Sequence, residues 1–166
     1  MLYAYRPTLN FYFLTFPPPG NCIFDREWTL QSNSSSGTTN SKQNEDTAKL
    51  LYGMIFSLRS VSQKLSSSPT PNNLRTISTG KYRVHILFTA SGLLFVLLSD
   101  LKQQDLSEVL HYLYSEIYVR FVVNNLLSPI DFAECEDEKR GQGFRKISNR
   151  NFIEGIERFL GPMVTQ

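Results

Sequence analysis

The segment 93–100, LLFVLLSD, most restricts the fold, because its first six residues are all apolar. A strand with one face in water alternates apolar and polar side chains, whereas a strand covered on both faces is apolar throughout. The run is too short for a membrane span, which needs about 20 residues. We therefore expect a central strand here, in a sheet that is covered on both faces.

The preceding segment, 81–89 (KYRVHILFT), alternates cleanly, as a strand does when only one of its faces is strongly apolar. One face carries Lys81, Arg83 and His85, and the other carries Tyr82, Val84, Ile86 and Phe88. Only the turn ASG separates this segment from the apolar strand, so the chain passes directly from one strand into the next.

Periodicity elsewhere predicts three more strands and three helices. The expected strands are 11–16 and 21–28, which form an opening hairpin around PPPG, and 74–79; the expected helices run from about 46 to 65, 105 to 127 and 152 to 163. The economical packing of these elements is an α+β domain with a five-stranded, mostly antiparallel sheet and helices on its faces.

The segment 30–45 is rich in Ser, Asn and Thr and has no apolar period, so we expect a flexible surface loop. The chain of 166 residues has the size of one domain. We assign 10–166 to that domain and treat 1–9 as an N-terminal extension.

Composition excludes several classes of protein. Apolar residues make up 41% of the chain and charged residues 19%, which is typical of a globular protein. A net charge of +2 gives no strong field for nucleic acid. The two cysteines, Cys22 and Cys135, lack a metal-ligand or redox spacing, so we expect free thiols and a cytoplasmic protein.

The sequence contains no pattern that predicts catalysis or a cofactor. Phosphate-binding loops, dinucleotide-binding glycine motifs and nucleophile elbows are absent. His85 and His111 are far apart and lack ligand spacing, and Cys22 is best interpreted as a small apolar strand residue. We expect no enzymatic activity, no metal and no cofactor.

A charged segment precedes the last helix and has three interpretations. The acidic residues Glu134, Glu136, Asp137 and Glu138 are followed directly by basic residues, which makes a local dipole rather than a basic patch. The segment is a solvated loop, a phosphate contact made by its basic residues, or a docking loop for a protein partner. The docking interpretation rests on Glu136, Asp137, Arg140 and Arg145.

The helix KLLYGMIFSLRS, residues 49–60, has two apolar faces. One stripe, Leu50, Leu51, Met54 and Leu58, has the spacing of a core-facing helix and continues through Val61 to Leu65. On the other side, Tyr52 and Phe56 lie four residues apart, so their rings can stack, with Ile55 and Arg59 nearby. These four residues either pack into the domain's own sheet or form a protein interface, which we favour because Tyr, Phe and Arg often anchor interfaces.

The motifs NCIFDREW, KLLYGMIFSLRS, STGKYRVH, ASGL and VLLSD closely resemble the Bet-five-type subunit family of the TRAPP vesicle-tethering complex, called subunit one in animals. The later motifs YSEIYV, NNLLSP, DFAE and RGQG are similar to its fungal members. The resemblance extends from about residue 21 to the end of the chain.

The resemblance implies a longin (profilin-like) fold, with a five-stranded antiparallel sheet, one helix on one face and two on the other. It implies a non-catalytic core subunit that scaffolds Rab GTPase nucleotide exchange and tethering in endoplasmic reticulum to Golgi transport. The implied partners are a neighbouring longin subunit, Bet-three-type subunits and, through the assembly, the Rab-type GTPase. The implied location is cytoplasmic and peripheral at cis-Golgi and endoplasmic reticulum membranes, with membrane contact only indirect.

Longin pairs meet helix to helix and extend their sheets edge to edge, so the resemblance also places the edge strand 74–79 at the interface, through Leu74 and Ile77. Members of the family usually begin their first strand almost at the initiator Met, whereas MLYAYRPTLN precedes it here. Two alternatives remain open. One is a longin-type SNARE or small adaptor subunit, and the other is a profilin-like ligand-sensing domain with a pocket lined by His85 or Cys22.

Overall fold

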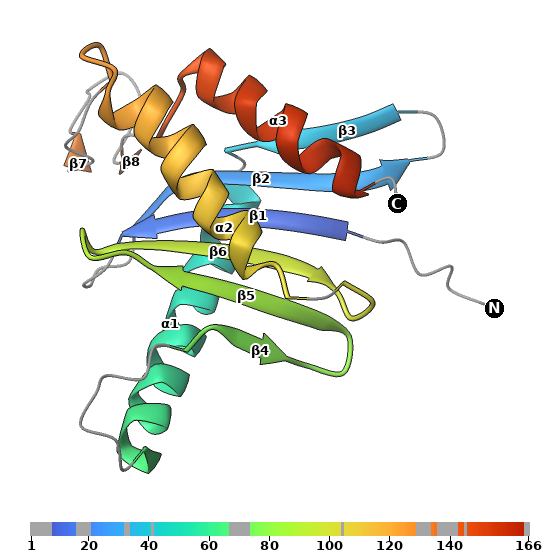
Figure 1. Ribbon diagram of the computed structural model, residues 1–166, viewed down its shortest axis with the longest axis vertical. Coiled ribbons are helices and arrows are strands. Elements are labelled where there is room, and N and C mark those ends of the chain that lie inside the picture. Colours follow the sequence, from blue (N-terminus) through green and yellow to red (C-terminus); the bar gives the residue numbers. More distant parts are fainter. Residues whose placement is uncertain are drawn as a thin grey trace.

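The structure is a computed structural model. It describes residues 8–15, 21–31, 34–40, 42–66, 74–103, 105–128, 134–135, 143–144 and 146–164. These residues form a six-stranded antiparallel sheet with helices on both faces (Figure 1). Across the sheet, the strands follow the order β3 (Ser34–Thr39), β2 (Cys22–Gln31), β1 (Thr8–Thr15), β6 (Leu93–Asp100), β5 (Tyr82–Phe88) and β4 (Thr76–Ser78).

The apolar segment β6 is a central strand, as its composition predicts. It pairs with β1 on one side, where Phe13 faces Phe95, and with β5 on the other, where Val84 faces Leu98. The β5–β6 hairpin closes through Thr89, whose backbone N–H donates to the carbonyl of Leu93 at 2.9 Å. Because helices cover both faces of the sheet at β6, the strand is apolar on both sides as far as Ser99.

The sixth strand, β3, lies in the segment predicted as a flexible loop, so that prediction is wrong for its central part. Polar residues of β3 pair with β2 from Arg26 opposite Thr39 to Gln31 opposite Ser34. Main-chain hydrogen bonds make this ladder, and they need no apolar side chains. The five predicted strands are present, and β3 adds a polar edge beside β2.

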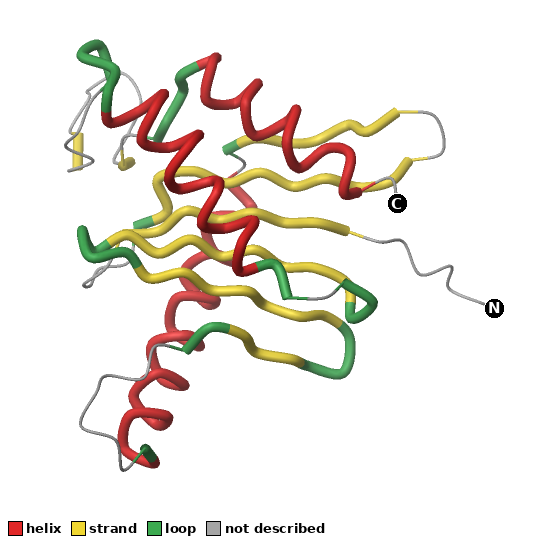
Figure 2. Tube along the Cα trace, viewed as in Figure 1, coloured by secondary structure: helices red, strands yellow, loops and turns green. Residues whose placement is uncertain are grey.

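Helices cover the two faces unequally, in the α+β longin arrangement expected. Helix α1 (Lys42–Leu65) packs on one face. On the other face lie α3 (Arg150–Val164) and a long helix that begins as α2 (Ser107–Tyr112) and continues in π-helical geometry as η1 (Leu113–Val123) (Figure 2). A short antiparallel pair, β7 (Glu134–Cys135) and β8 (Gly143–Phe144), is separate from the six-stranded sheet (Figure 1).

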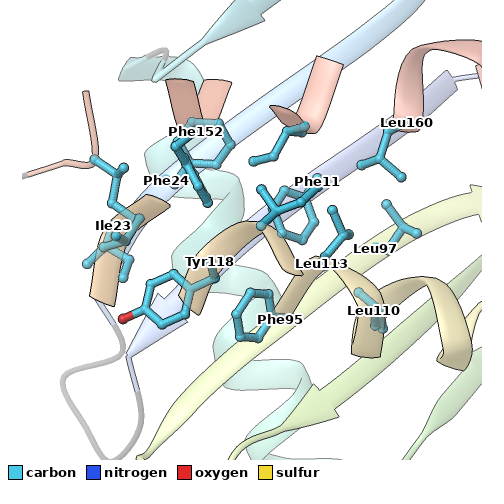
Figure 3. Packing of buried hydrophobic residues seen from close by; sticks show 14 of the residues in the cluster. Phe11, Ile23, Phe24, Phe95, Leu97, Leu110, Leu113, Tyr118, Phe152 and Leu160 are labelled. Atoms are coloured by element: carbon cyan, nitrogen blue, oxygen red, sulfur yellow. The ribbon is translucent and has the colours of Figure 1, made fainter. Parts of the chain in front are cut away.

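The larger hydrophobic core lies between the sheet and the two-helix layer (Figure 3). The rings of Phe24 and Phe152 meet edge to face, with centroids 5.1 Å apart, and join β2 to α3. Phe95 makes a similar contact with Tyr118 at 5.9 Å, which joins β6 to η1. Such aromatic pairs prefer edge-to-face geometry and contribute beyond their buried area.

The crossing of α3 over η1 depends on a glycine. A Cβ added to Gly155 would lie 3.3 Å from the Cε2 atom of Phe121 and 3.5 Å from the Cγ2 atom of Ile117. Asn149 completes the junction, because its side-chain amide donates to the carbonyl of Phe121 at 2.7 Å. The two helices therefore approach closely at this position, where an added Cβ would require the Phe121 ring to shift by a few tenths of an ångström.

Candidate protein interface on helix α1

The face of α1 that packs on the sheet consists of Ala48, Leu51, Tyr52 and Ile55, all buried. Ile55 is 1% exposed and Ala48 is completely covered. These residues pack against apolar side chains of β1, β5 and β6, including Val84 and Val96. Tyr52 and Ile55 therefore belong to the domain's own core, and the interpretation of their side of α1 as the exposed face is wrong.

The exposed face of α1 is instead an apolar stripe formed by Leu50, Leu58, Val61 and Leu65, which we call the α1 stripe. Leu50 is 76% exposed and Leu65 is 80% exposed. In the view of Figure 1, the last turns of α1 extend past β4, the outermost strand of the sheet. The stripe therefore continues beyond the part of the helix that the sheet covers.

The sequence interpretation exchanged these two faces because both are apolar. Leu51 and Met54 do pack towards the sheet, as predicted, but Leu50 and Leu58 do not. Ala48 was the signal in the sequence that could have identified the buried side, since a small residue lets a helix approach a sheet closely. Hydropathy alone does not distinguish a face that fits the sheet from one that faces solvent.

The predicted stacking of Tyr52 on Phe56 is confirmed, with ring centroids 6.3 Å apart and an interplanar angle of 19°. Phe56 is 45% exposed and extends the apolar surface of α1 to the other side of the buried face. The guanidinium of Arg59 lies 4.4 Å from the centre of the Phe88 ring, a cation–π contact between α1 and β5. Of the four helix residues predicted at an interface, Phe56 alone is classed as exposed.

The other predicted interface residues lie at the sheet edge. β4 is the terminal strand beside β5, as expected for an edge strand. Leu74 and Ile77 are half-buried and pack against the core beneath α1. The proposed docking residues Glu136, Asp137, Arg140 and Arg145 lie outside the described residues.

Two of the groups with potential chemistry, Cys22 and His85, are buried. Burial raises the pKa of the Cys22 thiol to about 12, so the nucleophilic thiolate does not form near neutral pH. His85, predicted on a polar face, is completely buried, and burial lowers its pKa. Within the described part of the chain, no three His, Cys, Asp or Glu side chains are grouped so as to hold a metal ion.

A buried polar cluster joins four segments near the start of α1. The carboxylate of Asp25 on β2 accepts hydrogen bonds from Lys146, at 3.2 Å, and from Asn44 on α1, at 2.9 Å. Asn40, which has a positive φ of 54°, bonds through its side chain to the backbones of Asp25 and Ile147. The cluster fixes the start of α1 and the segment before α3 against β2.

A cavity at the β4–β5 edge of the sheet differs from the pocket expected for a ligand-sensing domain. It is lined by residues of the β4–β5 edge and α2, and neither His85 nor Cys22 lines it. Among the described residues, no helix is both long enough and apolar enough to cross a membrane.

Comparisons with known proteins agree with the fold. Residues 11–136 match the Sybindin-like family. Over 146 residues, the chain is 71% identical to Trafficking protein particle complex subunit BET5 of Saccharomyces cerevisiae, covering 88% of this chain and 92% of the yeast protein. It is 33% identical over 115 residues to Trafficking protein particle complex subunit 1 of Rattus norvegicus, covering 69% of this chain and 75% of the rat protein.

These matches confirm the resemblance to Bet-five-type subunits, and they cover most of each relative. The element order, the antiparallel sheet and the one-against-two placement of helices are consistent with this kinship. The chain belongs to the Sybindin-like family.

Proposed function

We propose that this chain is a non-catalytic core subunit of a TRAPP vesicle-tethering complex and that the α1 stripe is one of its subunit contacts. The observation that carries the proposal is that four apolar residues on one side of α1 are exposed while the opposite side is packed on the sheet. Exposed apolar patches mark interaction sites, unlike single exposed apolar residues.

The names of the relatives support the same role, since the yeast and rat proteins are both subunits of the trafficking protein particle complex. By kinship, the partners are a neighbouring longin subunit and Bet-three-type subunits. The assembled complex acts on a Rab-type GTPase in endoplasmic reticulum to Golgi transport. The chain works in the cytoplasm at the surface of cis-Golgi and endoplasmic reticulum membranes, and touches them only through the assembly.

The contact surface on this chain combines the α1 stripe with the edge strand β4. Burying a Leu or Val side chain contributes roughly 1.5–3 kcal/mol relative to leaving it in water. The exposed edge of β4 offers main-chain groups to a strand of the partner, and Leu74 and Ile77 lie at the same edge. Helix packing and strand pairing would thus act together.

The test is co-expression with the neighbouring longin subunit, followed by size-exclusion chromatography. The variant Leu58→Asp with Leu65→Asp places two charges on the α1 stripe. Its matched control, Ser57→Asp with Gln63→Asp, places the same two charges at exposed positions of α1 outside the α1 stripe. We expect the first variant to lose the heterodimer and the control to keep it.

Circular dichroism of each free variant shows whether the domain still folds. An intact heterodimer with Leu58→Asp and Leu65→Asp, in a folded chain, would contradict the proposed contact. Loss of the heterodimer with both double variants would show that charge on α1, rather than the α1 stripe, disrupts assembly.

A further inference from the structure

A cavity of about 270 Å³ lies between the β4–β5 edge of the sheet and helix α2. It is lined by Leu74, Arg75, Ile86, Leu87, Phe88, Ser107 and His111, and we call it the edge cavity. The sheet ladder of β4 ends beside it, where the backbone N–H of Ile86 donates to the carbonyl of Arg75 at 2.7 Å. The cavity therefore opens where the edge strand stops and the helix layer begins.

Two basic side chains border the edge cavity from opposite sides. Arg75 comes from the sheet edge and His111 from α2, and both are exposed. Within the described part of the chain, neither side chain has a hydrogen bond or an ion pair. An arginine fork can bind a carboxylate through two parallel hydrogen bonds, and an imidazole can add a third donor.

The acidic residues near the edge cavity, Asp105 and Glu108, form no ion pair with Arg75 or His111 among the described residues. The carboxylate of Asp105 accepts hydrogen bonds from the hydroxyl of Ser107, at 2.6 Å, and from its backbone N–H, at 3.1 Å. These bonds lower the pKa of Asp105, and the same carboxylate lies 3.7 Å from His85. Glu108 is exposed on α2 and does not line the cavity.

The rest of the lining is apolar, with Leu74 and Leu87 among its residues. Pockets for drug-sized ligands occupy roughly 300–1,000 Å³, so the edge cavity is small for a cofactor. Its volume fits one or two side chains. Basic groups beside an apolar wall complement an acidic side chain with an apolar neighbour.

We propose that the edge cavity binds an acidic side chain, with an adjacent apolar residue, from an extended peptide segment of a protein partner. The carboxylate lies between Arg75 and His111, and the apolar neighbour packs on Leu74 and Leu87. This site is separate from the α1 stripe, and it adds an acidic ligand to the assembly contact proposed above. It shares Leu74 with the β4 edge of that contact, so we expect the peptide to bind the chain while this edge is free.

The test uses the full chain labelled with nitrogen-15 and two peptide probes, acetyl-Leu-Glu-Leu-amide and acetyl-Leu-Gln-Leu-amide. The probes differ only in the charge of the central side chain. We expect the Glu peptide to shift the backbone amide signals of Arg75, Leu87 and His111 in a saturable way. We expect it to bind at least tenfold more tightly than the Gln peptide.

Substitutions in the chain show which basic residues bind the Glu peptide. Arg75→Gln and His111→Gln should each weaken binding of the Glu peptide at least fivefold, and either one suffices if the other fails to fold. Lys102→Gln, which removes an exposed charge outside the edge cavity, should change the affinity less than twofold.

Three results would overturn the proposal. The two peptides could bind equally, which would make the charge irrelevant. Lys102→Gln could weaken binding as much as Arg75→Gln, which would mean diffuse attraction. Inorganic phosphate or anionic phosphatidylserine vesicles could shift the same amides as strongly as the peptide, which would make this an anion site rather than a peptide site. None of these results depends on the heterodimer, so this test and that of the assembly role can fail separately.

Discussion

His85 is completely buried between β5 and the start of α2, and its two ring nitrogens have different partners. Nδ1 accepts a hydrogen bond from the backbone N–H of Leu106 at 3.3 Å, so Nε2 carries the proton and donates to the Ser99 hydroxyl at 3.0 Å. That hydroxyl donates in turn to the carbonyl of Asp100. In its neutral form the imidazole therefore pairs both of its nitrogens, one with the Leu106 backbone N–H and the other with the Ser99 hydroxyl.

We expect acid to destabilise the fold through this residue. Burial lowers the pKa of His85, with Arg83 opposing protonation and Asp105 favouring it. The unfolded chain consequently takes up the proton first, and the free energy of unfolding falls as the pH drops below about 6.5, until the folded-state pKa is passed. Urea denaturation at pH 7.5 and 5.5 measures this fall.

The test variant for His85 replaces the imidazole with a side chain that does not titrate. His85→Gln should flatten the dependence on pH between these values. An equal slope in His85→Gln and the wild type would show that other groups cause the acid sensitivity.

Asp25 is also completely buried, and a buried carboxylate is stable only when hydrogen bonds and an opposite charge compensate for its lost hydration. Lys146→Met removes the ammonium at 3.2 Å and should lower the free energy of unfolding by about 3 kcal/mol. Adding Asp25→Asn removes the buried charge and should restore part of the loss. Arg150→Met, which breaks the exposed pair with Glu154, should change stability little in the same urea titration.

At the scale of elements, Gly155 sets the distance between α3 and η1. Gly155→Val places a branched side chain where even a Cβ would lie 3.3 Å from Phe121, so we expect a loss of about 1–3 kcal/mol. Gly53→Val on α1, where nothing lies within 4 Å, should be neutral or slightly stabilising, since valine is a better helix former than glycine. Thermal unfolding of both variants separates packing from helix propensity.

The elements also show what the sequence could predict. β6 was correctly placed because its lack of a polar face is a property of the strand alone. The faces of α1 were exchanged because Leu50 and Ile55 differ little in hydropathy, and only the shape of the sheet selects between them. β3 was missed because its ladder joins main-chain groups of Ser, Gly and Thr, which hydropathy does not register. The prediction that His85 lies on a polar face is wrong because α2 covers that face of β5. The alternation of residues within β5 cannot indicate that a helix will cover it.

For the whole molecule, the α1 stripe should make the isolated chain associate with itself. An exposed apolar patch promotes association when its partner is absent. Leu58→Asp with Leu65→Asp should lower the apparent mass in light scattering at high protein concentration. Any loss of stability should come mainly from Leu58, which is 39% exposed, rather than from Leu65, which is 80% exposed. Unchanged association in this variant would place the adhesive surface elsewhere.

The position of β1 has a consequence for the order in which the molecule can be built. β1 is synthesised before the other described elements, yet it occupies the interior of the sheet, and its partner β6 follows only after α1, β4 and β5. Asn10 cannot meet Leu98 until the segments between them have left the ribosome. Contacts between such distant residues slow folding, so nascent chains should expose the hairpin of β1 and β2 for much of their synthesis and depend on chaperones during that interval.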